Sequence, residues 1–313
     1  MSEYQYFEFR AVDRPLSAAD REALRALSSR AKVTATSFIN SYNFGDFGGD
    51  PAKLMERWFD LHLYLANWGS RRLMIRLPKR LFDRARLETL LDKVECAELR
   101  VAGENLILDI ARDELDLEDW QDDSRRLAGL APLRGELLAG DLRLFYLLWL
   151  TEVEGDMFGP DEPEPMPGIG PLTASLEAFA AFFGLDPDLV EAAAERSPAA
   201  PRTVGELRAR AEAIRLAHER AAVEEIKKAR RPRLDALAQR GDSVWDEVEA
   251  EIAYRNTAGY DKAVGLLADL RLLAEERGMA ADYARRLTAI KKRHSRKPQF
   301  LVRLAKTDEQ SER

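Results

Sequence analysis

The stretch that decides the fold of the last third of the chain reads Tyr260-Asp-Lys-Ala-Val-Gly-Leu-Leu-Ala-Asp-Leu-Arg-Leu-Leu-Ala-Glu-Glu-Arg277. Its apolar side chains recur at spacings of three and four residues, at Tyr260, Val264, Leu267, Leu270 and Ala274. This periodicity predicts an amphipathic helix, and Gly278 directly behind it predicts a left-handed helix stop.

A second amphipathic helix is predicted immediately afterwards. Tyr283, Leu287 and Ile290 lie on one of its faces, and basic residues cover the others. Helix pairs of this kind stack on one another and present surfaces, which favours interaction over catalysis.

Composition places the chain among soluble globular proteins. Its 313 residues, 46% hydrophobic and 33% charged, predict two or three domains. Cys96 is the only cysteine, which excludes an intramolecular disulfide and indicates a reducing compartment. The segment Met1 to Arg10 lacks the pattern of a signal peptide, and the longest apolar stretch, Leu142 to Leu150, is far shorter than the ~20 residues that cross a bilayer. We therefore expect a bacterial cytoplasmic protein with no membrane contact.

The net charge has opposite signs in the N-terminal and C-terminal parts of the chain. Residues 1 to 201 carry a net charge of −13, whereas residues 202 to 306 carry +8, within a total of −7. Such asymmetry indicates either a basic arm for nucleic acid or two halves that attract each other. The second interpretation is favoured, because Glu residues alternate with the basic residues at helical spacing.

An α+β domain is predicted over residues 1–113. Strands and helices alternate in it, and a hairpin with the turn Gly103-Glu104-Asn105 closes it. The expected strands are 4–9, 33–42, 61–67, 73–77, 97–101 and 106–110, and the expected helices begin near Ser17, Pro51 and Arg80.

Helices are predicted from there on. Residues 114–200 form a helical segment with one apolar helix at 133–153 and a Pro-rich loop at 155–171, interpreted as a linker or a loop on the surface. Residues 201–313 form a long helix followed by the basic helical C-terminal region with the tetratricopeptide-like pair. The long helix starts at Thr203, and Pro232 is expected to kink or end it.

Residues with catalytic or metal-binding patterns are scarce. His62, His218 and His294 lie in unrelated segments, and Cys96 has no companion at ligand spacing, so no zinc site is predicted. Gly45, Gly48 and Gly49 lack the Lys and Ser or Thr of a phosphate-binding loop. Asp109, Asp113, Glu114 and Asp116 are interpreted as a solvated acidic turn rather than a metal site. We expect no metal, no cofactor and no enzymatic activity.

Two surface features are candidates for binding. Phe44 and Phe47 lie in the glycine-rich loop 43–50, and exposed rings on a loop often anchor a protein partner. The alternative is that both rings pack under their own domain. The second feature is the densest basic run, formed by Lys291, Lys292, Arg293, Arg296 and Lys297. It lies at the end of a helix, where the helix dipole favours cations, and no base-reading motif accompanies it, so only weak nucleic-acid binding is predicted.

Four segments carry a resemblance over nearly the full chain: Ser2-Glu-Tyr-Gln-Tyr-Phe-Glu-Phe, Leu63-Tyr-Leu-Ala-Asn-Trp-Gly69, Leu142-Arg-Leu-Phe-Tyr-Leu-Leu-Trp-Leu150 and Arg202-Thr-Val-Gly-Glu-Leu207. They resemble a family of uncharacterised bacterial proteins that begin SEYQYxEF, which implies no activity.

The C-terminal segment from Tyr260 to Pro298 resembles the tail of bacterial SWIM zinc-finger proteins and, more loosely, a tetratricopeptide hairpin. The Cys-x-Cys and Cys-x-His ligands of that finger are absent, so its zinc and DNA binding are not implied, and no repeated unit of about 34 residues is present.

Together these features predict a non-enzymatic protein-interaction or scaffold component of a bacterial cytoplasmic complex. Its protein partner and its oligomeric state are left open. The alternative is a nucleic-acid-associated accessory factor that uses the basic C-terminal helices. A third possibility, an enzyme with an all-carboxylate site, needs distant residues to come together.

Overall fold

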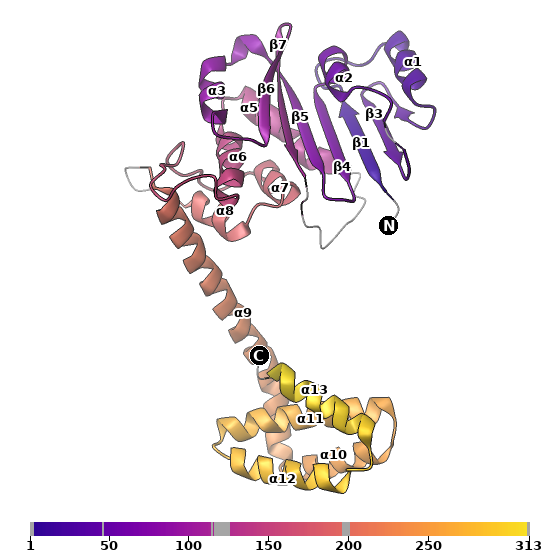
Figure 1. Ribbon diagram of the computed structural model, residues 1–313, viewed down its shortest axis with the longest axis vertical. Coiled ribbons are helices and arrows are strands. Elements are labelled where there is room, and N and C mark those ends of the chain that lie inside the picture. Colours follow the sequence, from indigo (N-terminus) through magenta and orange to yellow (C-terminus); the bar gives the residue numbers. More distant parts are fainter. Residues whose placement is uncertain (1–2, 46, 114, 116–125, 196–200, 312–313) are drawn as a thin grey trace. The chain divides into compact units, whose positions relative to one another are not determined.

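The computed structural model describes residues 3–45, 47–113, 115, 126–195 and 201–311. The chain divides into two compact units, Met1–Ala217, here called the sheet unit, and His218–Arg313, here called the helical unit (Figure 1). The predicted fold class is confirmed: an antiparallel sheet with helices comes first, and a mostly helical region follows. The sequence-based boundary at residue 113 falls inside the sheet unit.

One seven-stranded sheet organises the sheet unit, with the strand order β2-β3-β1-β4-β5-β7-β6 and every neighbouring pair antiparallel. Its strands are β1 (Gln5–Arg10), β2 (Lys32–Val33), β3 (Ser37–Tyr42), β4 (Leu61–Ala66), β5 (Arg71–Pro78), β6 (Ala97–Ala102) and β7 (Asn105–Arg112).

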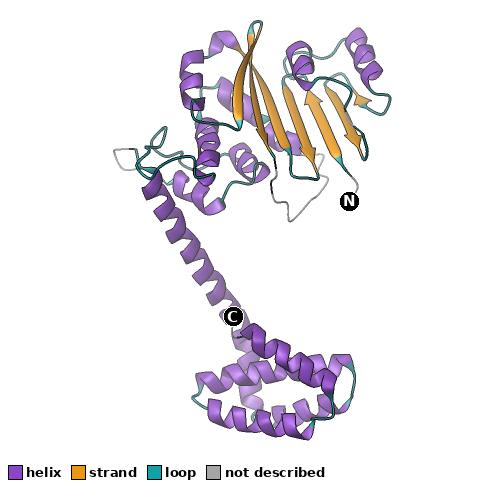
Figure 2. Cartoon of the chain, in the orientation of Figure 1, coloured by secondary structure: helices purple, strands orange, loops and turns teal. Residues whose placement is uncertain are grey.

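Helices cover both faces of this sheet to different extents (Figure 2). The first face packs its leucines against α3 (Arg84–Leu91), which lies between β5 and β6 in sequence, and against the helices that follow β7, and together they form the main core. The helices after β7 are α4 (Arg126–Leu130), α5 (Pro132–Leu138), α6 (Arg143–Glu154), α7 (Ala174–Phe182) and α8 (Pro187–Ala194), joined by the start of α9 (Val204–Arg240). The second face carries a smaller aromatic cluster under α1 (Ala18–Leu27) and α2 (Pro51–Arg57).

Local sequence signals explain several of these boundaries. Ser17 caps α1 through a reciprocal pair of hydrogen bonds with Asp20, as the sequence predicts. Asp50 caps α2 and Pro51 starts it. Gly103 adopts a positive φ of 58°, which the two-residue turn between β6 and β7 requires.

Three predicted elements differ from the structure. The strand expected at 33–42 is two strands, β2 and β3, because the Thr34 hydroxyl accepts the amides of Thr36 and Ser37 and folds a turn. The helix expected at 133–153 is α5 and α6, separated at Gly140, whose φ of +87° is incompatible with a helix.

The third difference concerns α9: of the two outcomes expected at Pro232, a kink or an end, the helix does not end there but continues to Arg240. Proline removes one main-chain donor from a helix, and the side of α9 around Pro232 is exposed, so water can satisfy the carbonyl that is left without a partner.

The helical unit contains the end of α9 and four further helices around one apolar core. They are α10 (Ser243–Ala253), α11 (Thr257–Glu276), α12 (Ala280–Arg293) and α13 (Pro298–Ser311). Gly278 has a φ of +67°, which confirms the predicted left-handed stop. A Cβ atom at Gly259 would lie 2.6 Å from the carbonyl oxygen of Glu251, so glycine is needed where α11 meets the end of α10.

Two ion pairs to one buried carboxylate also hold the helical unit. Asp269 of α11 is 1% exposed, accepts a hydrogen bond from Arg230 Nε at 3.1 Å, and lies 2.7 Å from Arg233 Nε in an ion pair. The likeness of α11 and α12 to a tetratricopeptide pair stays a prediction. Among the residues that the structure describes, no helix is both long and apolar enough to traverse a bilayer.

Candidate functional site

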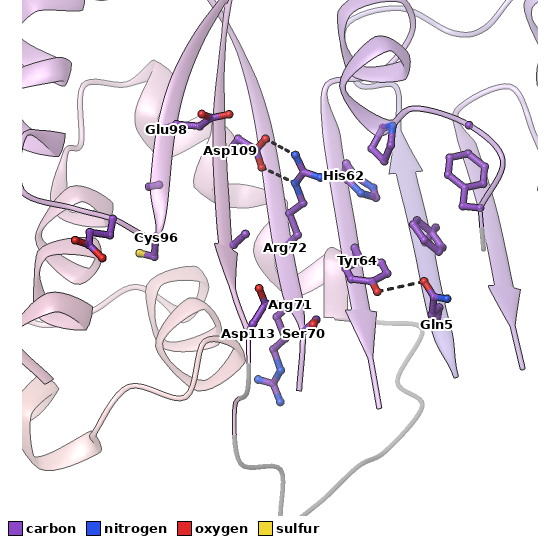
Figure 3. Close-up of a pocket in the computed structure, with 17 residues that line it drawn as sticks. Gln5, His62, Tyr64, Ser70, Arg71, Arg72, Cys96, Glu98, Asp109 and Asp113 are labelled. Atoms are coloured by element: carbon purple, nitrogen blue, oxygen red, sulfur yellow. Dashed lines mark hydrogen bonds and ion pairs between the residues drawn. The ribbon is translucent and has the colours of Figure 1, made fainter. Parts of the chain in front are cut away.

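The clearest hollow of the sheet unit lies on the second face of the sheet. Helices α1 and α2 and the loop 43–50 cover part of this face, and beside them β1, β4, β5, β7 and β6 line a depression of about 630 Å³. Figure 3 shows polar side chains from these strands gathered along it. This volume falls in the range that ligand-binding clefts usually have.

The register of the sheet decides which side chains reach this hollow. Tyr64 of β4 lies opposite Arg72 of β5, which lies opposite Ala111 of β7. Two residues further along, on the same face, Met74 of β5 lies opposite Asp109 of β7. Cross-strand partners point to the same face, so the hollow receives a polar residue from each of three adjacent strands.

Asp109 is the centre of an ionic network. It is 5% exposed and accepts two hydrogen bonds from Arg72, at 2.6 Å from Nε and 2.5 Å from Nη2 (Figure 3). Arg100 also binds Asp109, and the Arg100 Nε lies 2.5 Å from Glu98. The hydrogen bonds to Asp109 raise the pKa of Arg72 above its ordinary value. The geometry fixes the Arg72 guanidinium in the floor of the hollow.

His62 lines the same hollow from β4, the strand next to the one that carries Arg72. Its ring is fully buried and stacks on Phe9, with ring centroids 3.9 Å apart. Burial, together with the charge of Arg72, lowers the pKa of His62 to about 3. The ring is therefore neutral, and because Nδ1 lies 3.0 Å from the carbonyl oxygen of Glu8, it is Nδ1 that donates its proton there.

Cys96 and Arg71 lie at the other side of the hollow. The Cys96 sulfur lies 3.2 Å from the Thr151 hydroxyl, and burial raises the thiol pKa to about 11. This thiol is not activated as a nucleophile. Burial lowers the pKa of Arg71 to about 10, and Arg71 donates to the carbonyl oxygens of Ala181 and Phe182 at the end of α7.

The loop 43–50 forms one border of the hollow, and the structure separates its two phenylalanines. Phe47 packs into the aromatic cluster, 5.0 Å from Phe7 between ring centroids, whereas Phe44 is 73% exposed. Gln5 Nε2 donates to the Gly45 carbonyl oxygen at 3.1 Å. Of the two predicted partner-binding rings, Phe44 is thus presented to solvent and Phe47 fastens the loop.

The five basic residues predicted as a surface have different environments. Arg293 lies 2.5 Å from Glu249 of α10, and Lys297 Nζ donates to the Ile252 carbonyl oxygen at 2.9 Å. His294, between them in sequence, also contacts Glu249. Lys291, Lys292 and Arg296 are exposed.

This environment leads to a prediction about nucleic acid. Because Arg293 pairs with Glu249 and Lys297 is bonded to the Ile252 carbonyl oxygen of α10, we expect at most three cations of the run to contact a phosphate backbone and duplex binding to be weak. The slope of log K against log salt should not exceed about −3 in magnitude, at about −0.9 per phosphate contacted. A labelled duplex and a labelled single strand, titrated with the full chain at several salt concentrations, measure this slope.

Tight binding at physiological salt would contradict this prediction if it disappeared when all five residues were replaced by Ser. The matched control replaces five exposed basic residues of α9.

Arg72 and Tyr64 are site residues that were not singled out from the sequence, and His62 was considered only as a zinc ligand. Asp109 was considered only as a metal ligand, with Asp113 and with Glu114 and Asp116, which lie outside the described residues. One signal was available: Arg71-Arg72 and Asp109 are charged positions inside apolar strands. A buried charge needs a partner, and opposite signs on two predicted strands indicate a pair.

No protein-family model, curated protein or solved structure matches this chain. The protein can therefore be classified by its architecture alone: an antiparallel sheet unit with a polar hollow, followed by a helical unit.

Proposed function

We propose that this chain is a non-enzymatic protein-interaction component, or scaffold, of a bacterial cytoplasmic complex. In this proposal the loop 43–50 is the contact that anchors a protein partner. The observation that carries it is the state of Phe44: an aromatic ring that is 73% exposed, in a loop that is fastened just after it at Gly45 and Phe47.

Fastening matters because an anchor binds more tightly when it is already ordered. The Gln5 bond to Gly45 and the packing of Phe47 on Phe7 hold the backbone that carries Phe44. Little conformational entropy is then lost when a partner covers the ring. Large aromatic side chains of this kind contribute much of the energy at protein interfaces.

The groups of the neighbouring hollow favour recognition over proton transfer. His62 is neutral, the Cys96 thiol is protonated, and Arg72 is held in a bidentate pair with Asp109. Fixed donors and acceptors of this type give directional hydrogen bonding to a bound surface. The hollow thus provides polar specificity beside an apolar anchor.

Replacing Phe44 by Ala tests the proposal. We expect the affinity for the partner to fall by about 2 kcal/mol, roughly thirtyfold, because the anchor is lost. The free energy of unfolding should change by less than about 0.5 kcal/mol, since the ring is exposed. Phe47→Ala should instead lower the free energy of unfolding by about 2 kcal/mol through lost packing.

The measurement is quantitative capture from a lysate of the source bacterium with the tagged full chain. Val12→Ala is the matched control, because Val12 is an exposed apolar residue of the same unit, 55% accessible. Proteins retained by wild type and by Val12→Ala but lost with Phe44→Ala support the proposal. If Phe44→Ala retains every protein that wild type captures, the loop is not the anchor.

A further inference from the structure

Strand β6 ends the sheet, and its outer edge has main-chain groups without partners among the described residues. The hairpin register pairs Glu98 with Asp109 and Arg100 with Ile107. The Ala111 amide donates to the Cys96 carbonyl oxygen at 2.8 Å, so the even-numbered residues of β6 exchange hydrogen bonds with β7. In an antiparallel ladder the intervening residues, Ala97, Leu99 and Val101, direct their N–H and C=O groups outward.

This edge has less protection against pairing than the opposite end of the sheet, although it carries the charged residues Glu98 and Arg100. At the opposite end of the sheet the last strand, β2, has only 2 residues, but β6 has 6. The sequence of β6, Ala-Glu-Leu-Arg-Val-Ala, contains no Pro, Lys or Gly. Val101 is 43% exposed, and Glu98 is exposed as well. Long edges without such features readily accept another strand.

The sequence of β6 is complementary to itself in one register. When two copies run antiparallel about a two-fold axis at Leu99, Glu98 of each copy lies opposite Arg100 of the other. On the other face, Leu99 lies opposite Leu99, and Ala97 lies opposite Val101. Opposite charges and apolar pairs directly across strands both stabilise a sheet.

The main-chain pattern fits the same register. The pairs of this alignment that would exchange hydrogen bonds are 97 with 101, 99 with 99 and 101 with 97. These are the residues whose main-chain groups face outward from β7. Three such pairs give about six inter-strand hydrogen bonds. The charged pair and the apolar pairs therefore favour this alignment among those that the main-chain direction allows.

We propose that the chain forms a two-fold symmetric dimer through its β6 edges, which joins two seven-stranded sheets into one continuous sheet. The occupant of this edge is a second copy of the chain. The same surface serves both copies, as in most symmetric dimers.

Val101→Pro tests the main-chain bonds, because it removes an outward donor and leaves the β6–β7 ladder intact. Edge strands tolerate proline at such positions. Sedimentation equilibrium of the full chain over a wide concentration series should show a dimer for wild type. The dimer dissociation constant of Val101→Pro should rise by about tenfold or more, since two hydrogen bonds are lost per dimer. The matched control is Val101→Ala, which keeps the N–H group and should leave the dimer nearly unchanged.

Glu98→Arg tests the charges and does not depend on how the strand accepts proline. It places Arg opposite Arg100 at two symmetric positions, so the dimer should weaken, and added salt should partly restore it. The Glu98 pair with Arg100 of its own chain is exposed and contributes little to stability. A monomer at every concentration overturns the proposal, and so does a dimer that withstands both Val101→Pro and Glu98→Arg.

Discussion

Glu164→Ala is expected to lower the free energy of unfolding of the sheet unit by about 3–5 kcal/mol, the usual cost of removing one partner from a buried ion pair. Glu164 is 3% exposed in a loop that was expected to be a linker or a surface loop. Its carboxylate accepts from the Tyr146 hydroxyl at 2.6 Å, from the Arg202 amide at 2.9 Å and from Arg202 Nη2 at 3.1 Å.

The size of this effect follows from what the substitution leaves behind. Tyr146 is fully buried, and its hydroxyl would have no acceptor. Arg202, whose side chain is 13% exposed, would keep its bonds to the carbonyl oxygens of Ala192 and Ala193 but lose its counter-charge. Burial alone would raise the pKa of Glu164, but the hydrogen bonds from Arg202 and Tyr146 hold that pKa below its ordinary value. The carboxylate is therefore charged at neutral pH.

Chemical denaturation of the full chain measures this loss. In a Trp245→Phe background the helical unit contributes no tryptophan signal, and Trp149, 5.3 Å from Tyr146 between ring centroids, reports on the core around Glu164.

Glu162→Ala is the matched control, because Glu162 lies in the same loop and pairs with Lys93 at the surface, where the two side chains are 31% and 55% exposed. An exposed pair contributes about 0–1 kcal/mol. Equal losses for the two variants would contradict a structural role for the buried carboxylate.

The sequence predicted those parts of the fold that short-range signals determine. The helix start near Ser17, the hairpin around Gly103 and the helix stop at Gly278 depend on neighbouring residues, and all three are found in the structure. The boundary at Gly140 was missed, because the apolar spacing of a helix continues across Gly140 whereas the helical backbone conformation does not.

The segment 155–171 shows why the rest could not be predicted. Its prolines indicate a loop, and it is one, but its position depends on Arg202, which lies 38 residues after Glu164. The main chain confirms the attachment, because the Glu164 amide donates to the Arg202 carbonyl oxygen at 2.8 Å. Neither residue carries a local signal of this pair.

The candidate site has the same limitation. Arg72 and Asp109 are 37 residues apart, and only the strand order, which places β5 beside β7, brings them together. The two loop phenylalanines have identical chemistry, so composition cannot tell which of them is buried. Register and strand order depend on tertiary structure, and the pattern of a single sequence carries little information on either of them.

Acid is expected to destabilise the sheet unit through His62, by between about 2 and 3 kcal/mol at pH 4.5 relative to neutral pH. The fully buried ring has a pKa of about 3 in the folded chain, against 6.5 for an unperturbed histidine. Between these two values the unfolded chain binds a proton at His62 and the folded chain does not. Stability therefore rises with pH across this window and falls as the pH drops from about 6.5 towards 3.

His62→Asn isolates this contribution. The Asn amide can still donate towards the Glu8 carbonyl oxygen, which now accepts from Nδ1 at 3.0 Å, but it does not titrate. The variant loses ring stacking on Phe9 and is expected to be less stable at neutral pH. Its stability should nevertheless fall less steeply than that of wild type as the pH drops.

The measurement is the difference between wild type and His62→Asn in the free energy of unfolding, followed by tryptophan fluorescence in the Trp245→Phe background from pH 7.5 to pH 4.5. Carboxylates other than those affected by the substitution are present in both proteins, so their titration cancels in the difference. His294→Asn, in the helical unit, is the control for a histidine outside the sheet unit. Because burial rather than a nearby carboxylate sets the His62 pKa, the two curves should converge towards low pH. Parallel curves for wild type and His62→Asn would show that His62 takes up its proton in the folded chain and that the floor of the hollow carries an additional positive charge beside Arg72.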